Sequence, residues 1–571
     1  MPRGTHPHLS LRRRLAAGCA ALLLLALPVG AAAAATPSPS SPSPSPSPSP
    51  SPSPSDSSSG SDPLDPRITE IMGKPEYRYA QWGLLQVDPQ SGRTVHSRFP
   101  EQLFIPGSTA KLFSVSGAWH TLGAGHRFVT PLYAVGERRG ATLTGDLALV
   151  AQGDLTMGGR TRPDGTVAFT DLDHTYADDV PGATLTPQNP LAGIDLLARR
   201  VRDSGITRVD GNVIVDDRLF QPEPVLVPTP TPLILNDNLI DLTTTPGDRA
   251  GEPAGLDWRP KVAPYRVTST VKTVAAGKPT AVTVTASGDG TQIRLSGTIA
   301  AGAAPVLKVS PVTDPSSFGR TALIEALERA GVDVTADPVG ANPVDRLPAG
   351  YEGRARVAAY TSPPFADYAE LILKVSHNLG ANLGMCLMAV SKGSRACMDG
   401  FPVLASFLDG AGVDRAQVQL LDGRGGNPVD RSTPQAEIQM LTYWLRSPEA
   451  RLFREALPVL GVDGLLAENC RDCPARGKVF AKTGAAVGLD ALNNRLGIGA
   501  ITIAGYLDKG DGTFDVFYAG VTGASTPTTD PSGILDIAND LALIAAHLQE
   551  ATQQATREAT EAGPRSPVPR D

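Results

Sequence analysis

The stretch from Ile105 to Phe113 constrains this chain more than any other, because it places a hydroxyl and an amine one helical turn apart. The apolar run that begins at Leu112 predicts a helix entering a core, with Ser108 in its first turn. Side chains three residues apart share a helix face, so Ser108 and Lys111 are expected to touch. A lysine among apolar neighbours loses its preference for the charged form and can take the serine proton, which would make Ser108 a nucleophile.

The spacing S-x-x-K is by itself a weak signal, since a chain with 11 lysines in 571 residues contains it about once by chance. It does occur again, from Ser269 to Lys272. That copy lies in the alternating stretch 265–271, which predicts a strand, and an offset of three places two side chains on opposite faces of a strand. We therefore reject the second copy on geometry.

Two further triplets support Ser108. The only S-x-N of the chain is Ser376-His377-Asn378, and the only K-T-G is Lys482-Thr483-Gly484. In this order, S-x-x-K, S-x-N and K-T-G form the set found in penicillin-binding proteins and class A β-lactamases, which use the serine as a nucleophile. The three motifs must meet around one cleft for this chemistry, although 268 positions separate Ser108 from Ser376.

Periodicity indicates an α+β fold. Strands are expected at 79–87, 93–99, 479–483, 501–507 and 513–522. Helices are expected at 191–204, 317–330, 400–410, 433–446 and 534–560, and residues 364–390 predict one long helix or a helix pair that carries the S-x-N triplet. Residues 222–310 are mainly β in character. We expect a catalytic domain of helices and an antiparallel sheet from 62–135 and 355–560, split by one or two mainly β inserted domains at 136–354.

The N-terminal segment predicts export. Three arginines at 12–14 precede an uncharged run and the alanines 31–35, so residues 1–36 are interpreted as a signal peptide. The alternative is an uncleaved membrane anchor, since the 21 uncharged residues 15–35 are just long enough to span a bilayer. Residues 37–61 are a Ser/Pro-rich linker that cannot bury apolar area, and residues 561–571 are expected to be a disordered tail.

Four cysteines remain once the signal is removed: Cys386, Cys397, Cys470 and Cys473. An even count in an exported chain predicts two disulfides, with three possible connectivities, of which we favour the local pairing. Cys470 and Cys473 could instead form a redox pair or half of a zinc site, but no second C-x-x-C or H-x-x-H accompanies them. We expect no metal and no cofactor.

Other site classes find little support in the sequence. A net charge of −7 gives no basic footprint, so nucleic acid is not expected as a partner. The chain contains no G-x-S-x-G motif, which argues against an α/β-hydrolase triad. The eight histidines form no cluster along the chain, and His377 is expected to be a wall of the pocket and not a base.

With these motifs in place, residues 70–525 resemble the class C low-molecular-mass penicillin-binding proteins, the D-alanyl-D-alanine carboxypeptidase and endopeptidase family. Members of that family typically carry a large insertion between the first two motifs. Further stretches look like family sequence in family order, among them Gly145-Asp146-Leu147, Asn236-Asp237-Asn238, Ser362-Pro363-Pro364 and residues 457–464.

The resemblance implies acyl transfer on peptidoglycan stem peptides, with β-lactam antibiotics as covalent inhibitors. Ser108 would attack the bond between two D-alanines, Lys111 would act as base, and Ser376 would relay the proton to the leaving amine. Asn378 would hold the substrate amide. Lys482 and Thr483 of the Lys482-Thr483-Gly484 triplet would bind the terminal carboxylate, and the oxyanion would lie between the backbone N–H groups of Ser108 and Ala485.

Three departures from the family pattern leave other functions open. The family usually carries a hydroxyl directly after K-T-G, where this chain has Ala485, and it often has Glu where this chain has Asn382. The family's Asp-Gly-Ser-Gly loop here contains Arg424. The alternatives are a weakened penicillin-binding module that senses wall fragments, or a β-lactamase, which would need a carboxylate near Ser108 to activate water.

Overall fold

The computed structural model describes residues 62–562. The predicted signal peptide at 1–36 and the linker at 37–61 lie outside the described residues, and so does the predicted tail apart from its first two residues, which end the last helix. Within residues 62–562, no helix combines the length and the apolar character needed to cross a bilayer.

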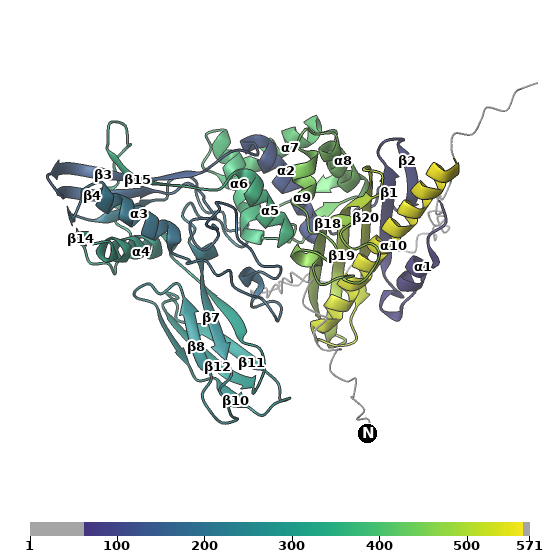
Figure 1. The fold of residues 1–571 in the computed structure, drawn as a ribbon, viewed down its shortest axis with the longest axis horizontal. Coiled ribbons are helices and arrows are strands. Elements are labelled where there is room, and N and C mark those ends of the chain that lie inside the picture. Colours follow the sequence, from purple (N-terminus) through teal and green to yellow (C-terminus); the bar gives the residue numbers. More distant parts are fainter. Residues whose placement is uncertain (1–61, 563–571) are drawn as a thin grey trace, which may run out of the picture.

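An antiparallel sheet organises the half of the molecule that contains both ends of the described chain (Figure 1). Its strand order is β18-β19-β20-β1-β2, and a short strand β21 pairs with β19. The bounds of these strands are β1 Gln81–Asp88, β2 Arg93–Arg98, β18 Val479–Asp490, β19 Arg495–Asp508, β20 Phe514–Thr522 and β21 Ala524–Ser525. β18 is an edge strand whose first residues pair with the segment 458–460, so its outer side is open for pairing only beyond Ala481.

Helices cover both faces of this sheet. The long helix α10 packs on one face, where it buries Ile501 and Ile503, and a cluster of helices packs on the other face against Ala504 and Tyr506. Because both faces are covered, the centre of β19 is buried without interruption from Ala500 to Leu507, and Thr502 is its one polar residue. The helices are α1 Pro66–Met72, α2 Lys111–Leu122, α5 Phe365–Lys374, α6 Asn378–Ser391, α7 Gly400–Gly410, α8 Pro434–Leu445, α9 Ala450–Glu455 and α10 Ser532–Ala562.

The chain leaves this body after α2 and returns at α5. The strands at the two crossings, β3 and β15, pair antiparallel, so the inserted region starts and ends side by side. Its first unit is a sheet of order β14-β5-β4-β3-β15, with β6 paired to β4 and with α3 and α4 packed on it. These elements are β3 Val129–Arg139, β4 Thr142–Val150, α3 Ala192–Asp203, β5 Arg208–Asp210, β6 Val213–Asp216, α4 Pro315–Arg329, β14 Asp333–Val334 and β15 Arg356–Thr361.

A second inserted unit is entirely β and extends from the first (Figure 1). It contains a sheet of order β13-β7-β8 and a sheet of order β10-β12-β11 with β9 paired to β12. Its strands are β7 Leu239–Thr245, β8 Gly255–Arg259, β9 Arg266–Ser269, β10 Lys272–Val274, β11 Ala281–Ala286, β12 Gln292–Ala300 and β13 Val306–Pro311. The domain limits at 135/136 and 354/355 stay predictions; β3 runs through the first limit.

Two expectations change in detail. Ser108 lies in a short 3-10 turn, Gly107–Ala110, and the α-helix starts only at Lys111. β18 continues seven residues beyond the predicted strand end at 483, because its pairing with β19 continues to Asp490. The β18–β19 hairpin therefore extends past the K-T-G triplet.

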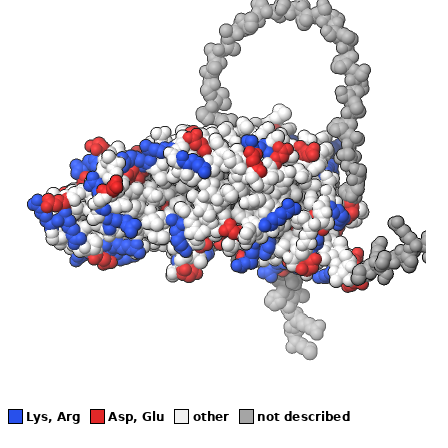
Figure 2. Space-filling model, turned by 90° about the horizontal axis from the view of Figure 1, so that it is seen from above, with Lys and Arg blue, Asp and Glu red and all other residues white. Residues whose placement is uncertain are grey.

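The face drawn in Figure 2 shows no large surface patch of only positive or only negative side chains. Basic and acidic side chains are interspersed over both ends of this elongated face, and the area between them carries few charged residues. Many surface arginines have an acidic neighbour, as in the ion pairs of Arg139 with Glu137 and of Arg208 with Asp210.

Candidate active site

Ser108 and Lys111 touch at the start of α2. The distance between Lys111 Nζ and Ser108 Oγ is 2.6 Å. The 3-10 turn that carries Ser108 runs directly into α2, so the two side chains lie one turn apart on the same side. Lys111 is fully buried, whereas Ser108 is partly exposed and lines a cavity. The second S-x-x-K copy lies far from this turn, with Lys272 exposed on β10.

Glycines bring the K-T-G strand against the Ser108 turn. Gly107 has φ +52°, and a Cβ on it would lie 2.6 Å from the backbone nitrogen of Ala485. A Cβ on Gly484 would lie 2.3 Å from the carbonyl oxygen of Pro106 and 2.8 Å from the nitrogen of Ser108. Both positions therefore need glycine for this close approach. The approach places the backbone nitrogens of Ser108 and Ala485 on neighbouring segments.

The predicted helix over 364–390 is a helix pair, and the S-x-N triplet forms the break. α5 ends at Lys374 and α6 starts at Asn378. Ser376 lies between them with φ +58° and is fully buried. Its Oγ lies 3.3 Å from Lys111 Nζ, and Asn378 Oδ1 accepts a hydrogen bond from the same nitrogen at 2.8 Å.

Lys482 completes the cluster from β18. Its Nζ donates to Ser376 Oγ at 2.9 Å and to the carbonyl oxygen of Thr483 at 2.6 Å. Thr483 and Ala485 are two residues apart on β18 and so share one of its faces. The structure thus brings together all eight residues that the sequence places in the catalytic and substrate-binding sites.

Electrostatics favour a neutral Lys111. Burial lowers the pKa of Lys111 well below its ordinary value, and the positive charges of Lys482 and Arg424 lower it further against the opposing charge of Asp422. The Lys111 Nζ also lies 3.3 Å from the carbonyl oxygen of Arg424. A neutral amine 2.6 Å from a serine hydroxyl is arranged to accept its proton.

A cavity of about 390 Å³ opens beside Ser108. Asn378, Arg424 and Ala485 line it, together with the part of β18 that follows Ala485. Because β18 is an edge strand, a bound peptide can pair with its backbone there. The geometry therefore offers a nucleophile at one end of a groove that suits an extended peptide.

Comparison with known proteins identifies the family. The D-Ala-D-Ala carboxypeptidase 3 (S13) family matches residues 64–528, which is most of the chain. The chain belongs to this family. The S13 assignment confirms the resemblance that the motifs carried, and with it a serine-type carboxypeptidase of the class C low-molecular-mass penicillin-binding proteins.

Individual relatives agree with the S13 assignment. A D-alanyl-D-alanine carboxypeptidase of Actinomadura sp. (strain R39) is 28% identical over 451 residues, covering 75% of this chain and 77% of the relative. Penicillin-sensitive carboxypeptidase A of Dictyostelium discoideum is 22% identical over 428 residues, covering 72% and 78%. The crystal structure of penicillin binding protein 4 from Haemophilus influenzae superposes with a TM-score of 0.62 at 18% identity, covering 83% of this chain and 98% of that one. The structural likeness confirms the α+β fold class.

The cysteines of this S13 protein pair locally. Cys386 bonds Cys397, and Cys470 bonds Cys473, which is the connectivity that the sequence analysis favoured. The first disulfide ties α6 to the segment before α7. The backbone of the neighbouring Arg395 accepts a hydrogen bond from Gln221 of the inserted region, so this disulfide also lies at the junction between the two parts.

The expectation that His377 is a wall of the pocket is wrong. His377 is fully buried, it does not line the cavity beside Ser108, and its ring caps α6 by accepting a hydrogen bond from the backbone of Gly380. Its other ring nitrogen faces Asp237 of the inserted region at 3.1 Å. His174 contacts the same carboxylate, so two of the histidines do converge in space although they lie far apart in sequence.

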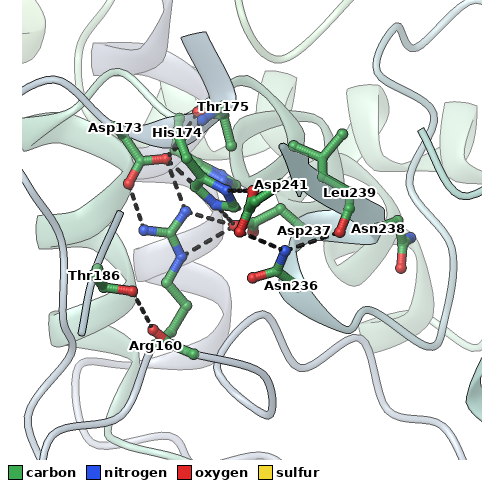
Figure 3. A network of polar contacts seen from close by, with 12 residues as sticks. Arg160, Asp173, His174, Thr175, Thr186, Asn236, Asp237, Asn238, Leu239 and Asp241 are labelled. Carbon is green, nitrogen blue, oxygen red and sulfur yellow. Dashed lines mark hydrogen bonds and ion pairs between the residues drawn. The ribbon is translucent and has the colours of Figure 1, made fainter. Parts of the chain in front are cut away.

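Asp237 belongs to a buried polar network that sequence reasoning missed (Figure 3). Arg160 lies between Asp173 and Asp237, and His174 lies between Asp237 and Asp241. Asp173, His174 and Asp237 have ligand atoms close enough together to hold a metal ion. However, the Arg160 guanidinium already donates to both carboxylate oxygens of Asp173 and to Oδ2 of Asp237, and this network is therefore better suited to ion pairing than to metal binding.

Proposed function

We propose that this protein is an exported serine DD-peptidase that cleaves the terminal D-Ala-D-Ala bond of peptidoglycan stem peptides through an acyl-enzyme on Ser108. The observation that carries the proposal is the contact of Ser108 Oγ with a buried Lys111 Nζ at 2.6 Å, inside a site completed by Ser376 and Lys482. Family membership supports the same reaction class.

In the acylation step, neutral Lys111 takes the proton of Ser108 while Oγ attacks the carbonyl carbon between the two D-alanines. The backbone N–H groups of Ser108 and Ala485 receive the developing oxyanion. The proton then passes to the leaving amine through Ser376, whose Oγ lies within reach of both lysines. Departure of D-alanine leaves an ester on Ser108, which water hydrolyses to regenerate the enzyme.

Substrate binding uses residues of the second and third motifs. Lys482 supplies positive potential for the terminal carboxylate, and Thr483 supplies a hydroxyl. Asn378 holds the amide of the peptide, which extends along the β18 edge. Because this groove is open, the same site accepts a cross-linked peptide, so endopeptidase activity is a second and weaker expectation.

We expect β-lactams to acylate Ser108 and remain bound. Solved structures with the same fold include penicillin binding protein 4 of Haemophilus influenzae in complex with a β-lactam, which supports this expectation. A β-lactamase would need a free carboxylate to activate water near Ser108. Asp422 is the acid whose charge acts on Lys111, but its oxygens accept from Arg424, Gly425 and Gly426.

The weakened-module alternative rests on Ala485 and Asn382. Asn382 has a structural task here, since its Oδ1 accepts from the backbone of Gly423 and its Nδ2 donates to Pro228. This residue therefore gives no reason to expect an inactive site.

The partners of the proposed DD-peptidase are peptidoglycan peptides and β-lactams. Membrane anchoring arises only if the N-terminal signal is retained.

Release of free D-alanine tests the proposal. Purified protein is incubated with a diacylated peptide ending in D-Ala-D-Ala, and D-alanine is measured with D-amino acid oxidase. We expect release by the wild type, no release by Ser108→Ala, and no release from the matched peptide ending in L-Ala-L-Ala. Absence of release by a folded wild type that is nevertheless acylated by penicillin would favour the sensing module.

A further inference from the structure

The turn that presents Ser376 has a backbone conformation that serine rarely adopts. Its φ is +58°, in the left-handed region, and its side chain must reach two lysine nitrogens from that conformation. A non-glycine residue persists there only where the surroundings fix it. The question is which groups hold the turn between α5 and α6.

The turn is held by Tyr176, which lies outside the catalytic motifs, and by His377, the middle residue of the S-x-N triplet. Tyr176 is buried in the inserted region, 200 residues earlier in the chain, and its hydroxyl donates to the carbonyl oxygen of Ser376. His377 supplies the second contact. Its Nδ1 accepts from the backbone N–H of Gly380 at 3.0 Å, so the ring proton lies on Nε2, which faces Asp237 Oδ1 at 3.1 Å.

Asp237 is itself held rigidly. Its Oδ2 receives Arg160 Nη2 at 2.5 Å and His174 Nε2 at 2.8 Å, and all three side chains are buried (Figure 3). Burial opposes the charge of Asp237, but the Arg160 charge and the contacts with His377 and His174 together outweigh it and keep the pKa of this carboxyl well below its ordinary value. An ionised Asp237 therefore faces the N–H of His377.

The backbone around Asp237 is also unusual. Asn236, Asp237 and Asn238 all have left-handed φ values, of +52°, +54° and +56°. Side chains lock this run, since Asn236 donates to Asp241 Oδ2 at 3.1 Å and Asn238 donates to Thr231 Oγ1 at 2.9 Å. Three successive residues in a strained conformation present one carboxylate at the turn of the S-x-N triplet.

We propose that Tyr176, His377 and Asp237 are positioning residues for acylation: they hold the Ser376 turn so that Ser376 Oγ stays between Lys111 and Lys482. This inference rests on the proposed function and goes beyond it, because it gives the inserted region a part in catalysis. The inserted region supplies Tyr176 and Asp237, whereas the catalytic motifs supply the residues that they hold.

Two variants remove these contacts with little other change. Tyr176→Phe keeps the ring in the core and removes only the hydroxyl that donates to Ser376. His377→Asn keeps a side chain that caps α6, since asparagine is a good N-cap residue, but it is too short to reach Asp237. Thr186→Val is the matched control, because Thr186 is a buried neighbour of Arg160 whose hydroxyl donates to the carbonyl of Gly159 and touches neither the turn nor Asp237.

The measurement is the rate of acylation by a fluorescent penicillin at a series of concentrations, with the full-length protein and thermal unfolding as a check of folding. The concentration dependence separates non-covalent binding from the acylation rate constant. We expect both variants to lose at least about tenfold in the rate constant while the binding constant changes by less than about threefold. The double variant should lose less than the product of the two single losses, because both residues fix one turn.

Thr186→Val should acylate within about twofold of the wild type, even if it unfolds at a lower temperature. Folded Tyr176→Phe and His377→Asn proteins that acylate at the wild-type rate overturn the positioning proposal. The proposal is also overturned if the two variants lose no more acylation rate than a Thr186→Val protein of the same thermal stability. A wild-type protein that penicillin does not acylate refutes the proposed function, and with it the reaction that these residues would assist.

Discussion

The side-chain nitrogen of Lys111 lies 2.6 Å from the hydroxyl oxygen of Ser108. Ser108 lines a cavity that the edge strand β18 also lines. The amine is fully buried, while the hydroxyl is partly exposed to substrate. This contact makes Lys111 the base on the proposed account, and the predictions below follow from it and from its neighbours.

Replacement of Lys111 by methionine should lower the rate of acylation by about 10²–10⁴-fold, the usual contribution of a positioned base. The protein should remain folded, because a buried amine is replaced by an apolar side chain of similar length. The chain supplies its own control in Lys272 of the second S-x-x-K copy, and Lys272→Met should leave the rate unchanged. Penicillin acylation measured by stopped flow compares the two, and equal rates would refute the role of Lys111.

Arg424→Gln should move the acid limb of the acylation profile to higher pH. Arg424 is one of the charges that lower the pKa of Lys111, so its removal raises that pKa. Because Lys111 acts in its neutral form, the rate falls as pH falls through this pKa, and a higher pKa shifts the fall upward. Arg431→Gln is the control, since Arg431 lines the same cavity but donates to the carbonyls of Pro428 and Asp430. A limb that stays in place would show that the Arg424 charge does not act on the base.

Ala485→Ser should improve the binding of substrates with a free terminal carboxylate. Position 485 shares a face of β18 with Thr483, so a hydroxyl there can donate to the same carboxylate. A hydrogen bond to a charged group is worth about 1.5–3 kcal/mol, which predicts a KM roughly tenfold lower or better. The same peptide with a terminal amide should show no such gain, and an equal gain with the amide would place the effect elsewhere.

The buried Glu437 should make the protein lose stability as pH rises. Its Oε1 accepts from Thr109 Oγ1 and Ser432 Oγ, and burial raises its pKa to about 8. The folded state therefore keeps a proton that the unfolded state releases above its ordinary pKa of 4.5, so the stabilisation is complete below that value and is lost as pH rises toward 8. Glu437→Gln, which cannot titrate, should remove a slope of up to about 1.4 kcal/mol per pH unit. Urea unfolding of the wild type and of Glu437→Gln, at a series of pH values from about 4.5 to about 8, gives the free energy of unfolding against pH. The same slope in both proteins would contradict the prediction.

The sequence sufficed to select the residues that meet in the candidate site, because each of them belongs to a short motif. Ser108 and Lys111 share a helical turn, and the S-x-N and K-T-G triplets each occur once, so no long-range information was needed to select them. The fold class followed from the same residues and from the alternation and apolar runs around them. Element ends were less accurate, as at β18, because strand pairing decides where a strand stops.

The buried network was beyond local reasoning. Arg160, Asp237 and His377 come from distant segments, and nothing in the local sequence of any one of them indicates the other two. The one signal was Asn236-Asp237-Asn238, since asparagine and aspartate tolerate the left-handed region better than other non-glycine residues. The family resemblance includes this run but assigns it no role. The Asp237 carboxylate faces the S-x-N turn only because the inserted region folds against α6, and local sequence does not show that contact.

Intact-mass analysis after incubation with penicillin tests the central claim most directly. The account predicts one adduct with the full mass of the drug, located on Ser108 by peptide mapping, stable for long enough to be isolated, and absent from Ser108→Ala. An adduct on another residue, or none on a folded wild-type protein, would contradict the claim that Ser108 and Lys111 form the acylating pair.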